Sequence, residues 1–253
     1  PNAIREASLN IESYSLRAGL DAEGLRVRDL GNVQTVMDVG ETLRRISLIV
    51  EEQVSRCVGI LVLGGEHTIT LGILEGFKPN YPAVLCFDAH MDLRDEYLGS
   101  RVNHATVVRR MCELVGADRV LLVGVRGFTG GELRYARSIG LRFYTSLDVF
   151  KKPAHVAEEV KRWIDEFERV YMSIDLDVLD PSQAPAVGNP EPEGLTTTQL
   201  LDILWEAFNS PESPRVAGLD IVEAAPPYDS GLTAVQAAKI ALEALCLMDA
   251  GGR

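Results

Sequence analysis

Acidic and histidine side chains follow four apolar segments of this 253-residue chain, each at the point where the segment ends. The polar groups are Gly64–His67, Asp88–Asp92, Asp175–Asp177 and Glu223. In the second and third groups, Asp-x-His-x-Asp and Asp-x-Asp crowd carboxylates beside apolar residues, where uncompensated charge is costly. Divalent cations supply that compensation, so the pattern predicts a metal site.

The candidate ligands are two histidines and four aspartates: His67, Asp88, His90, Asp92, Asp175 and Asp177. Oxygen and nitrogen ligands without cysteine suit a harder ion such as Mn²⁺ better than structural zinc. Six side chains with two bridging carboxylates also match a pair of ions about 3.5–4 Å apart. A single Asp after a strand is more often a helix cap or a turn former. The joint pattern favours the metal.

The elements that must position these side chains are short apolar runs that alternate with helical patterns. The expected strands are Val58–Leu63, Ala83–Phe87, Val120–Val125, Leu141–Tyr144, Val170–Ile174 and Val216–Val222. The expected helices are Thr68–Phe77, His104–Val115, Gly131–Ile139, His155–Phe167, Thr197–Phe208 and Leu232–Met248. Such alternation is typical of a parallel sheet covered on both faces. Because the carboxyl ends of parallel strands share one edge, we expect the polar groups to meet in one crevice there.

Composition narrows the class of protein. Hydrophobic residues make up 46% of the chain and charged residues 25%, which is typical of a globular protein, and we expect one domain over 1–253. The formal net charge of −12 argues against nucleic acid and anionic membranes as partners and favours a cationic ligand or metal ions, although solubility alone also explains it.

The apolar run Cys57–Leu63 is too short to span a bilayer. The four cysteines form no CxxC pair, which predicts a reduced, cytoplasmic protein with packed thiols.

Three of the polar groups, with their neighbours, resemble the signatures of the ureohydrolases, the arginase and agmatinase family. They are Gly64–His67, Asp88–Asp92 and Ser173–Pro181. The resemblance runs from Ala3–Ser8 to Glu223 and the final helix, and it is strongest to archaeal-type agmatinases. It implies a three-layer α/β/α sandwich on a mostly parallel sheet of about eight strands, assembled as trimers or hexamers. In that family a strand precedes the segment that begins here, so we expect an N-terminal strand to be absent from this numbering.

The resemblance also implies the roles of individual residues. One manganese ion would be held by His67, Asp88, Asp92 and Asp175. A second would be held by Asp88, His90, Asp175 and Asp177, which gives two Mn²⁺ per subunit. Glu223 matches the carboxylate that meets the substrate guanidinium, and His104 matches the histidine that shuttles protons.

This chemistry suits a guanidino substrate on physical grounds. A guanidinium is resonance-stabilised and water attacks it slowly, whereas a hydroxide that bridges two divalent ions is a strong nucleophile near neutral pH. Glu223 adds negative charge beside the ligand cluster, which suits a small cationic substrate. His104 titrates in the working range and could protonate the departing amine. His155 has no motif around it and is expected on a helix surface.

The expected activity is hydrolysis of agmatine to urea and putrescine. The segments Asp92–Tyr97, His104–Arg110 and Ala225–Asp229 resemble agmatinases more than arginases. The loop Ala186–Glu191 departs from the usual Gly-Thr-Gly-Thr-Pro-Glu, and this departure affects substrate recognition rather than the metal ligands. An arginase or a guanidinobutyrase with the same mechanism stays open. A catalytically silent, metal-binding regulatory relative also stays open. Urea release in the presence of Mn²⁺ would distinguish the enzymes from this silent relative.

Overall fold

A six-stranded parallel sheet forms the centre of the computed structural model, which describes residues 1–57, 59–208 and 215–250. Its strand order is β3-β8-β7-β4-β5-β6, and every neighbouring pair is parallel. The six strands are β3 (Ile60–Leu63), β4 (Ala83–Phe87), β5 (Val120–Val125), β6 (Arg142–Thr145), β7 (Arg169–Asp175) and β8 (Arg215–Val222). Two short strands, β1 (Tyr14–Ser15) and β2 (Leu20–Asp21), pair with each other in a separate antiparallel hairpin.

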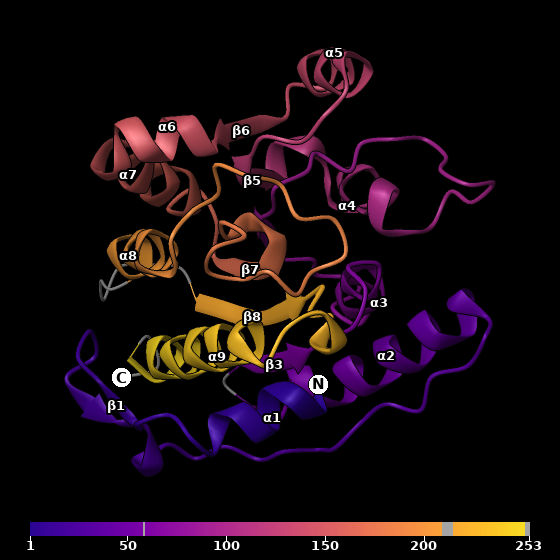
Figure 1. The fold of residues 1–253 in the computed structure, drawn as a ribbon. Helices are drawn as coiled ribbons and strands as arrows, with labels where there is room; N and C mark the ends of the chain where they lie inside the picture. The colour runs from indigo at the N-terminus through magenta and orange to yellow at the C-terminus, as the bar shows by residue number, and fades with distance from the viewer. Residues whose placement is uncertain (58, 209–214, 251–253) are drawn as a thin grey trace.

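Helices cover both faces of this sheet and give three layers (Figure 1). On one face lie α1 (Asn2–Ser8), α6 (Ser146–Lys151), α7 (Pro153–Ile164), α8 (Thr197–Phe208) and α9 (Leu232–Ala250). On the other face lie α2 (Val39–Val54), α3 (Ile69–Glu75), α4 (Val107–Val115) and α5 (Gly130–Ser138). No helix in the described part of the chain is long and apolar enough to cross a membrane.

Two hydrophobic cores join these layers because successive side chains of a strand point to opposite faces. In β4, for example, Leu85 and Phe87 pack with α7 and α8, whereas Val84 and Cys86 pack with α3 and α4. All five side chains of β4 are fully buried. This burial on both faces explains why the central strands are continuous apolar runs in the sequence.

The predicted three-layer fold is confirmed, with a different number of strands. The main sheet of the described chain has six strands, whereas the family resemblance implied about eight. Six is also the number of apolar runs in the sequence that were expected to form strands. Each expected strand is present, although Val58, the first residue of one, lies outside the described residues. The sequence analysis missed helix α2, whose start is capped by the Asp38 side chain accepting from the Glu41 N–H.

The strand order places the polar groups at the point where the chain changes direction in the sheet. From β4 the chain continues outward to β5 and β6, whereas from β7 it continues to β8 on the opposite side. Ligands of open parallel sheets bind at such a switch point, beyond the carboxyl ends of the two central strands. Here these strands are β4 and β7, which end directly before Asp88 and at Asp175.

Candidate active site

Asp88 and Asp175 face each other because their strands are neighbours in register. Phe87 of β4 pairs with Ile174 of β7, so the next residue of each strand lies at the same level of the sheet edge. Both side chains are almost fully buried. Two facing carboxylates at the floor of a crevice are suited to bridge a pair of cations.

Three of the aspartates share one arrangement in which Oδ1 accepts a backbone N–H. The donors are His90 N–H to Asp88 at 2.6 Å, Asp177 N–H to Asp175 at 2.9 Å, and Ala89 N–H to Asp177 at 3.0 Å. The Oδ2 atoms approach imidazole nitrogens instead. Nδ1 of His67 lies 3.2 Å from Asp88 Oδ2 and 3.1 Å from Asp175 Oδ2, and Nδ1 of His90 lies 2.9 Å from Asp177 Oδ2. The Oδ2 atoms and the Nδ1 nitrogens therefore converge, while the hydrogen bonds to Oδ1 hold the carboxylates in place.

The ring of His67 is oriented from behind by a buried chain of hydrogen bonds. Ser173 Oγ donates to Asp220 Oδ1 at 2.7 Å and lies 3.1 Å from His67 Nε2. Since the hydroxyl has used its only proton on Asp220, it accepts the Nε2–H of His67. In the neutral ring, Nδ1 of His67 then carries no proton, and its lone pair faces Asp88 and Asp175.

Asp220 is the base of this chain and is fully buried in β8. It also accepts from Thr70 Oγ1 at 2.8 Å and from the Tyr171 hydroxyl at 2.9 Å. Burial raises its pKa, and the hydrogen bonds from Ser173, Thr70 and Tyr171 oppose that rise. The sequence analysis missed Asp220, although a carboxylate inside an apolar strand is itself a sign of a specific partner.

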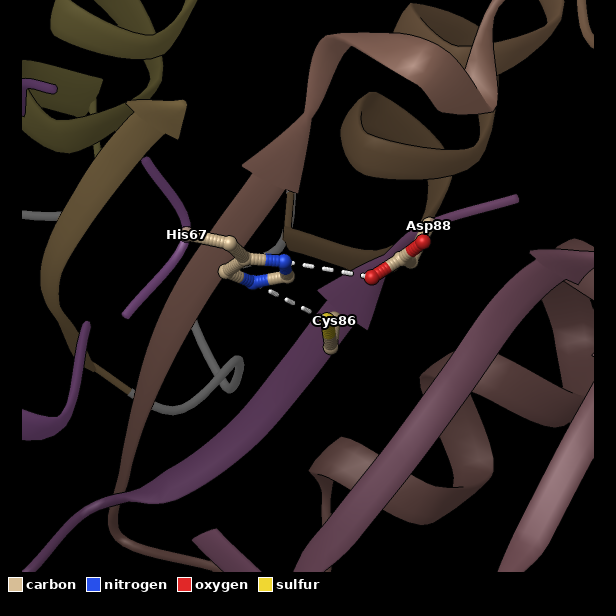
Figure 2. Close-up of side chains that lie close together, drawn as sticks. All are labelled: His67, Cys86 and Asp88. Atoms are coloured by element: carbon tan, nitrogen blue, oxygen red, sulfur yellow. Dashed lines mark hydrogen bonds and ion pairs between the residues drawn. The ribbon is translucent and has the colours of Figure 1, made fainter. Parts of the chain in front are cut away.

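The residues fit a metal ion, because two of the converging atoms are buried without a hydrogen-bond partner. These atoms are His67 Nδ1 and Asp88 Oδ2. Candidate ligand atoms cluster in two groups, His67 with Cys86 and Asp88, and Asp88 with His90 and Asp177. Cys86 lies on the other side of the imidazole, with Sγ 3.9 Å from Nε2, so it cannot share an ion with Nδ1 (Figure 2). Burial raises the pKa of the Cys86 thiol to about 12, which keeps it protonated.

The electrostatics of the cluster also suits bound cations. Burial, followed by the neighbouring carboxylates, raises the pKa values of Asp88, Asp92 and Asp175. Burial alone would lower the pKa of His90, but the hydrogen bond to Asp177 and the nearby carboxylates raise it to about 9. The cluster thus gathers protons where cations would neutralise the carboxylates.

Glu223 and Asp92 complete the crevice from strained backbone positions. Glu223 has φ of +65° and Asp92 of +47°, values that residues other than glycine rarely adopt. Glu223 Oε1 accepts the backbone N–H of His67 at 2.6 Å, and Asp92 Oδ2 lies 3.8 Å from His67 Nδ1. Such outliers concentrate at functional sites, where the surrounding structure holds them in place.

His104 lies at the edge of the crevice, in a 3-10 turn before α4 rather than in the expected helix. Its Nδ1 is 2.9 Å from Oε1 of Glu66, which also accepts the His104 backbone N–H at 2.7 Å. The Tyr97 ring meets the imidazole edge-on, with centroids 5.7 Å apart. The sequence analysis gave Glu66 no role even though it belongs to the Gly64–His67 group. His155 is exposed on α7, as predicted.

Arg126 was also missed, and it holds two loops of the site together. Its guanidinium donates to the backbone carbonyls of Asp177, Val178 and Leu179 in one loop. It also donates to the carbonyls of Glu191 and Pro192 in the other. Glu191 in turn lies near His90, with Oε1 3.8 Å from Nε2. The Pro-rich stretch 181–192 is thus an ordered wall of the crevice.

Comparison with known proteins gives one consistent result. The Arginase family model matches residues 1–247. An agmatinase of Bacillus anthracis is 35% identical over 97% of this chain and 83% of its own length, and a guanidinobutyrase of Pseudomonas aeruginosa is 34% identical over 98% and 79%. The crystal structure of an agmatine ureohydrolase of Thermoplasma volcanium superposes with a TM-score of 0.89 at 34% identity, over 99% of this chain and 83% of that one.

Proposed function

The chain belongs to the arginase family of hydrolases that act on guanidino C–N bonds, and from that premise we propose that it converts agmatine to urea and putrescine with two Mn²⁺ ions. The observation that carries the proposal is the convergence of buried carboxylate oxygens and imidazole nitrogens, with His67 Nδ1 and Asp88 Oδ2 unpartnered. The similarity to the Bacillus anthracis agmatinase supports agmatine as the substrate.

The proposed ligands follow from the geometry of the crevice and the family pattern. One ion would take His67, Asp88, Asp92 and Asp175, and the other Asp88, His90, Asp175 and Asp177. Asp88, directly after β4, and Asp175, at the end of β7, would each contribute to holding both ions. When bound, the ions lower the pKa of water so that hydroxide is available near neutral pH.

Glu223 and His104 would act on the substrate itself. Glu223 keeps one oxygen on the His67 N–H and presents its negative charge to the guanidinium, which orients the central carbon toward the ligand cluster. His104 would give a proton to the departing amine nitrogen as the C–N bond breaks, since an amine leaves more readily in its protonated form. Both groups lie beside the carboxylate cluster, whose field favours a cationic substrate.

Urea release tests this proposal directly. Purified protein with Mn²⁺ is assayed side by side with agmatine, arginine and 4-guanidinobutyrate. Agmatine is expected to be turned over most efficiently. Absence of urea from all three would leave a metal-binding protein without this activity, whereas preference for arginine would move the assignment to arginase.

A guanidino acid is the second candidate substrate, because one loop cation is free to bind a carboxylate. Arg94 is exposed and stacks on the Tyr97 ring at 4.8 Å, and no ion-pair partner for it is found among the described residues. Arg101, by contrast, is paired with Asp95 at 2.8 Å. If 4-guanidinobutyrate is the substrate, Arg94→Ala should raise its KM and leave that of agmatine unchanged or lower.

We also propose that the enzyme is a cytoplasmic homo-oligomer, a trimer or a hexamer. Cys86, Cys112 and Cys246 are buried free thiols in the structure, while Cys57 is exposed instead of packed as expected. Free thiols suit a reducing compartment. Analytical ultracentrifugation of the purified protein measures the assembly.

A further inference from the structure

Glu66 is a partly exposed carboxylate in the loop after β3, and its contacts lead to His104 rather than to the ligand cluster. Its Oε1 accepts two hydrogen bonds from His104, one from the backbone N–H at 2.7 Å and one from Nδ1 at 2.9 Å. Glu66 follows β3 and His104 precedes α4, and the strands β8 and β7 separate β3 from β4 in the sheet. The pair therefore joins two loops that the sheet itself leaves apart.

The contact defines which imidazole nitrogen is free. A carboxylate accepts hydrogen bonds and does not donate them, so Nδ1 of His104 carries the proton. The neutral ring is then the Nδ1–H tautomer, with the lone pair on Nε2. No hydrogen-bond partner of Nε2 is found in the described parts of the chain, so Nε2 is free to exchange a proton with a substrate.

A second contact restrains the plane of the same ring. Tyr97 meets it edge-on, with an interplanar angle of 75°. Asn103 holds Tyr97 in place, because its amide donates to the Tyr97 carbonyl at 2.9 Å. His104 is thus fixed at Nδ1 and across its plane, although its side chain is 37% exposed.

We propose that Glu66 is a positioning residue for proton transfer by His104. It holds the imidazole so that Nε2–H of the protonated ring passes its proton to the departing amine nitrogen as the C–N bond breaks. The ring returns to the neutral Nδ1–H tautomer, and the hydrogen bond to Glu66 persists throughout. The role in catalysis rests on the proposed function of His104, whereas the Glu66–His104 pairing does not.

The charges around His104 agree with this geometry. The hydrogen bond to Glu66 is the largest influence on the pKa of His104 and raises it. Burial, the next largest, lowers this pKa, the negative charges of Glu66 and Glu223 raise it, and the nearby His90 lowers it. Glu66 is therefore the main group that raises the pKa of His104. It prepares the acid form of His104 before the amine leaves.

Imidazole nitrogen NMR tests the pairing without reference to activity. The chain has only four histidines, so ¹⁵N-labelled protein loaded with diamagnetic Mg²⁺ gives an assignable spectrum, with exposed His155 as an internal reference. We expect neutral His104 to be the Nδ1–H tautomer. Glu66→Gln should shift the His104 titration to lower pH, and Glu66→Ala should abolish the tautomer preference. Glu96→Gln removes an exposed charge in the loop that carries Tyr97 and should do neither. An Nε2–H tautomer, or a His104 titration that ignores Glu66→Gln, overturns the proposal.

A double-mutant cycle with Mn²⁺-loaded enzyme tests the role in catalysis. We expect Glu66→Gln to lower kcat by roughly 10–100-fold, the usual cost of removing a supporting partner, with KM and metal content little changed. In a His104→Asn background the same substitution should cost nothing further, because its effect passes through His104. Additive losses, or loss of metal in Glu66→Gln, would show that Glu66 acts elsewhere. If His104→Asn alone leaves kcat unchanged, the proposed function of His104 fails, and the NMR result still decides the pairing.

Discussion

The backbone N–H of His67 donates to Oε1 of Glu223 at 2.6 Å, although the two residues are 156 positions apart. Glu223 in turn donates its own N–H to the carbonyl of Gly65 at 2.8 Å. These two bonds fasten the loop after β3 to the end of β8. The proposed metal ligand and the proposed substrate-binding carboxylate therefore share one rigid support, so a change at Glu223 tests substrate binding only if the His67 support survives.

Glu223→Gln meets that condition, because the amide oxygen can still accept the His67 N–H. We expect Mn²⁺ content to be retained and KM for agmatine to rise by roughly 10–100-fold, the worth of a hydrogen bond to a charged group of about 1.5–3 kcal/mol. Steady-state kinetics and elemental analysis measure the two quantities. Glu168→Gln, an exposed residue before β7, removes the same charge at a distance and should leave KM near the parent value. An unchanged KM in Glu223→Gln would remove the residue from substrate binding.

His104→Asn should separate proton transfer from metal binding. His104 contacts Glu66 and Tyr97 rather than the carboxylate cluster, so we expect both ions to stay bound. The kcat should fall by roughly 10²–10⁴-fold, the usual contribution of a positioned acid or base, with KM nearly unchanged. Loss of metal together with activity would contradict a role limited to protons.

The hydrogen-bond chain behind His67 predicts a stability effect at Tyr171. Tyr171→Phe removes one of the three donors to the buried Asp220 carboxylate and leaves the fold volume almost unchanged. We expect the free energy of unfolding to fall by about 1.5–3 kcal/mol, the usual contribution of a hydrogen bond to a charged group, because Oδ2 of Asp220 then keeps only the Thr70 donor. Urea titration measures this as a lower midpoint at constant slope. Tyr228→Phe, at a ring that is 68% exposed, is the matched control and should leave the midpoint unchanged.

The sequence predicted the strands, and the meeting of the polar groups at one edge of the sheet, because both depend on local pattern. Buried parallel strands are continuous apolar runs, and a polar group directly after such a run must lie at the edge of the sheet. The three-layer fold followed from the same alternation.

What the sequence could not predict depends on contacts between distant residues. Ser173 and Asp220 lie inside strands that are otherwise mostly apolar, and their pairing exists only because β7 and β8 are neighbours in register. Glu66 and His104 meet across loops whose strands are not adjacent. Helix α2 was missed because much of its surface is polar and few of its residues are buried, so its apolar signal is weak.

Removal of the metal ions should destabilise the protein in a pH-dependent way. Burial and neighbouring carboxylates raise the pKa values of Asp88 and Asp175, so in the ion-free protein their contribution to stability is present at low pH and lost as pH rises through those values. Bound ions need the deprotonated ligands, so they stabilise more as pH rises. We expect the Tm difference between Mn²⁺-loaded and chelated protein to widen from about pH 5 to about pH 8. A Tm difference that stays constant or decreases as pH rises would contradict the proposed carboxylate ligands.

Loss of metal by substitution should follow the same geometry. Asp175→Ala removes a proposed bridge and should lower metal content more than His67→Ala, which removes a ligand of one ion. Mn²⁺ should restore activity to chelated protein better than Mg²⁺ or Zn²⁺, as suits a site of carboxylate and imidazole ligands. Elemental analysis of the two variants and reactivation assays give the result; equal metal loss in both would argue against bridging by Asp175.

Substrate choice follows from which loop charges are already paired. Asp95 is held by Arg101 and Arg110 at 2.8 and 3.0 Å, so neither of these arginines is free to receive the carboxylate of arginine. Glu66 and Glu223 face His104 with negative charge, and Arg94 is the one loop cation for which the described residues show no ion-pair partner.

Agmatine is doubly cationic and has no carboxylate, so it suits this environment better than arginine. The carboxylate of arginine would face the negative charges of Glu66 and Glu223, with Arg94 as the one unpaired loop cation among the described residues. We expect kcat/KM for agmatine to exceed that for arginine by at least about 10²-fold, the scale on which an unpaired buried group is rejected. The net charge of −12 adds long-range attraction for the dication, so the ratio should narrow as ionic strength rises. Arg94→Ala should leave the ratio high or raise it. Equal or better turnover of arginine at saturating Mn²⁺ would instead mean that Arg94, or a rearranged Arg101, binds the carboxylate, and it would assign arginine as the substrate of the same site.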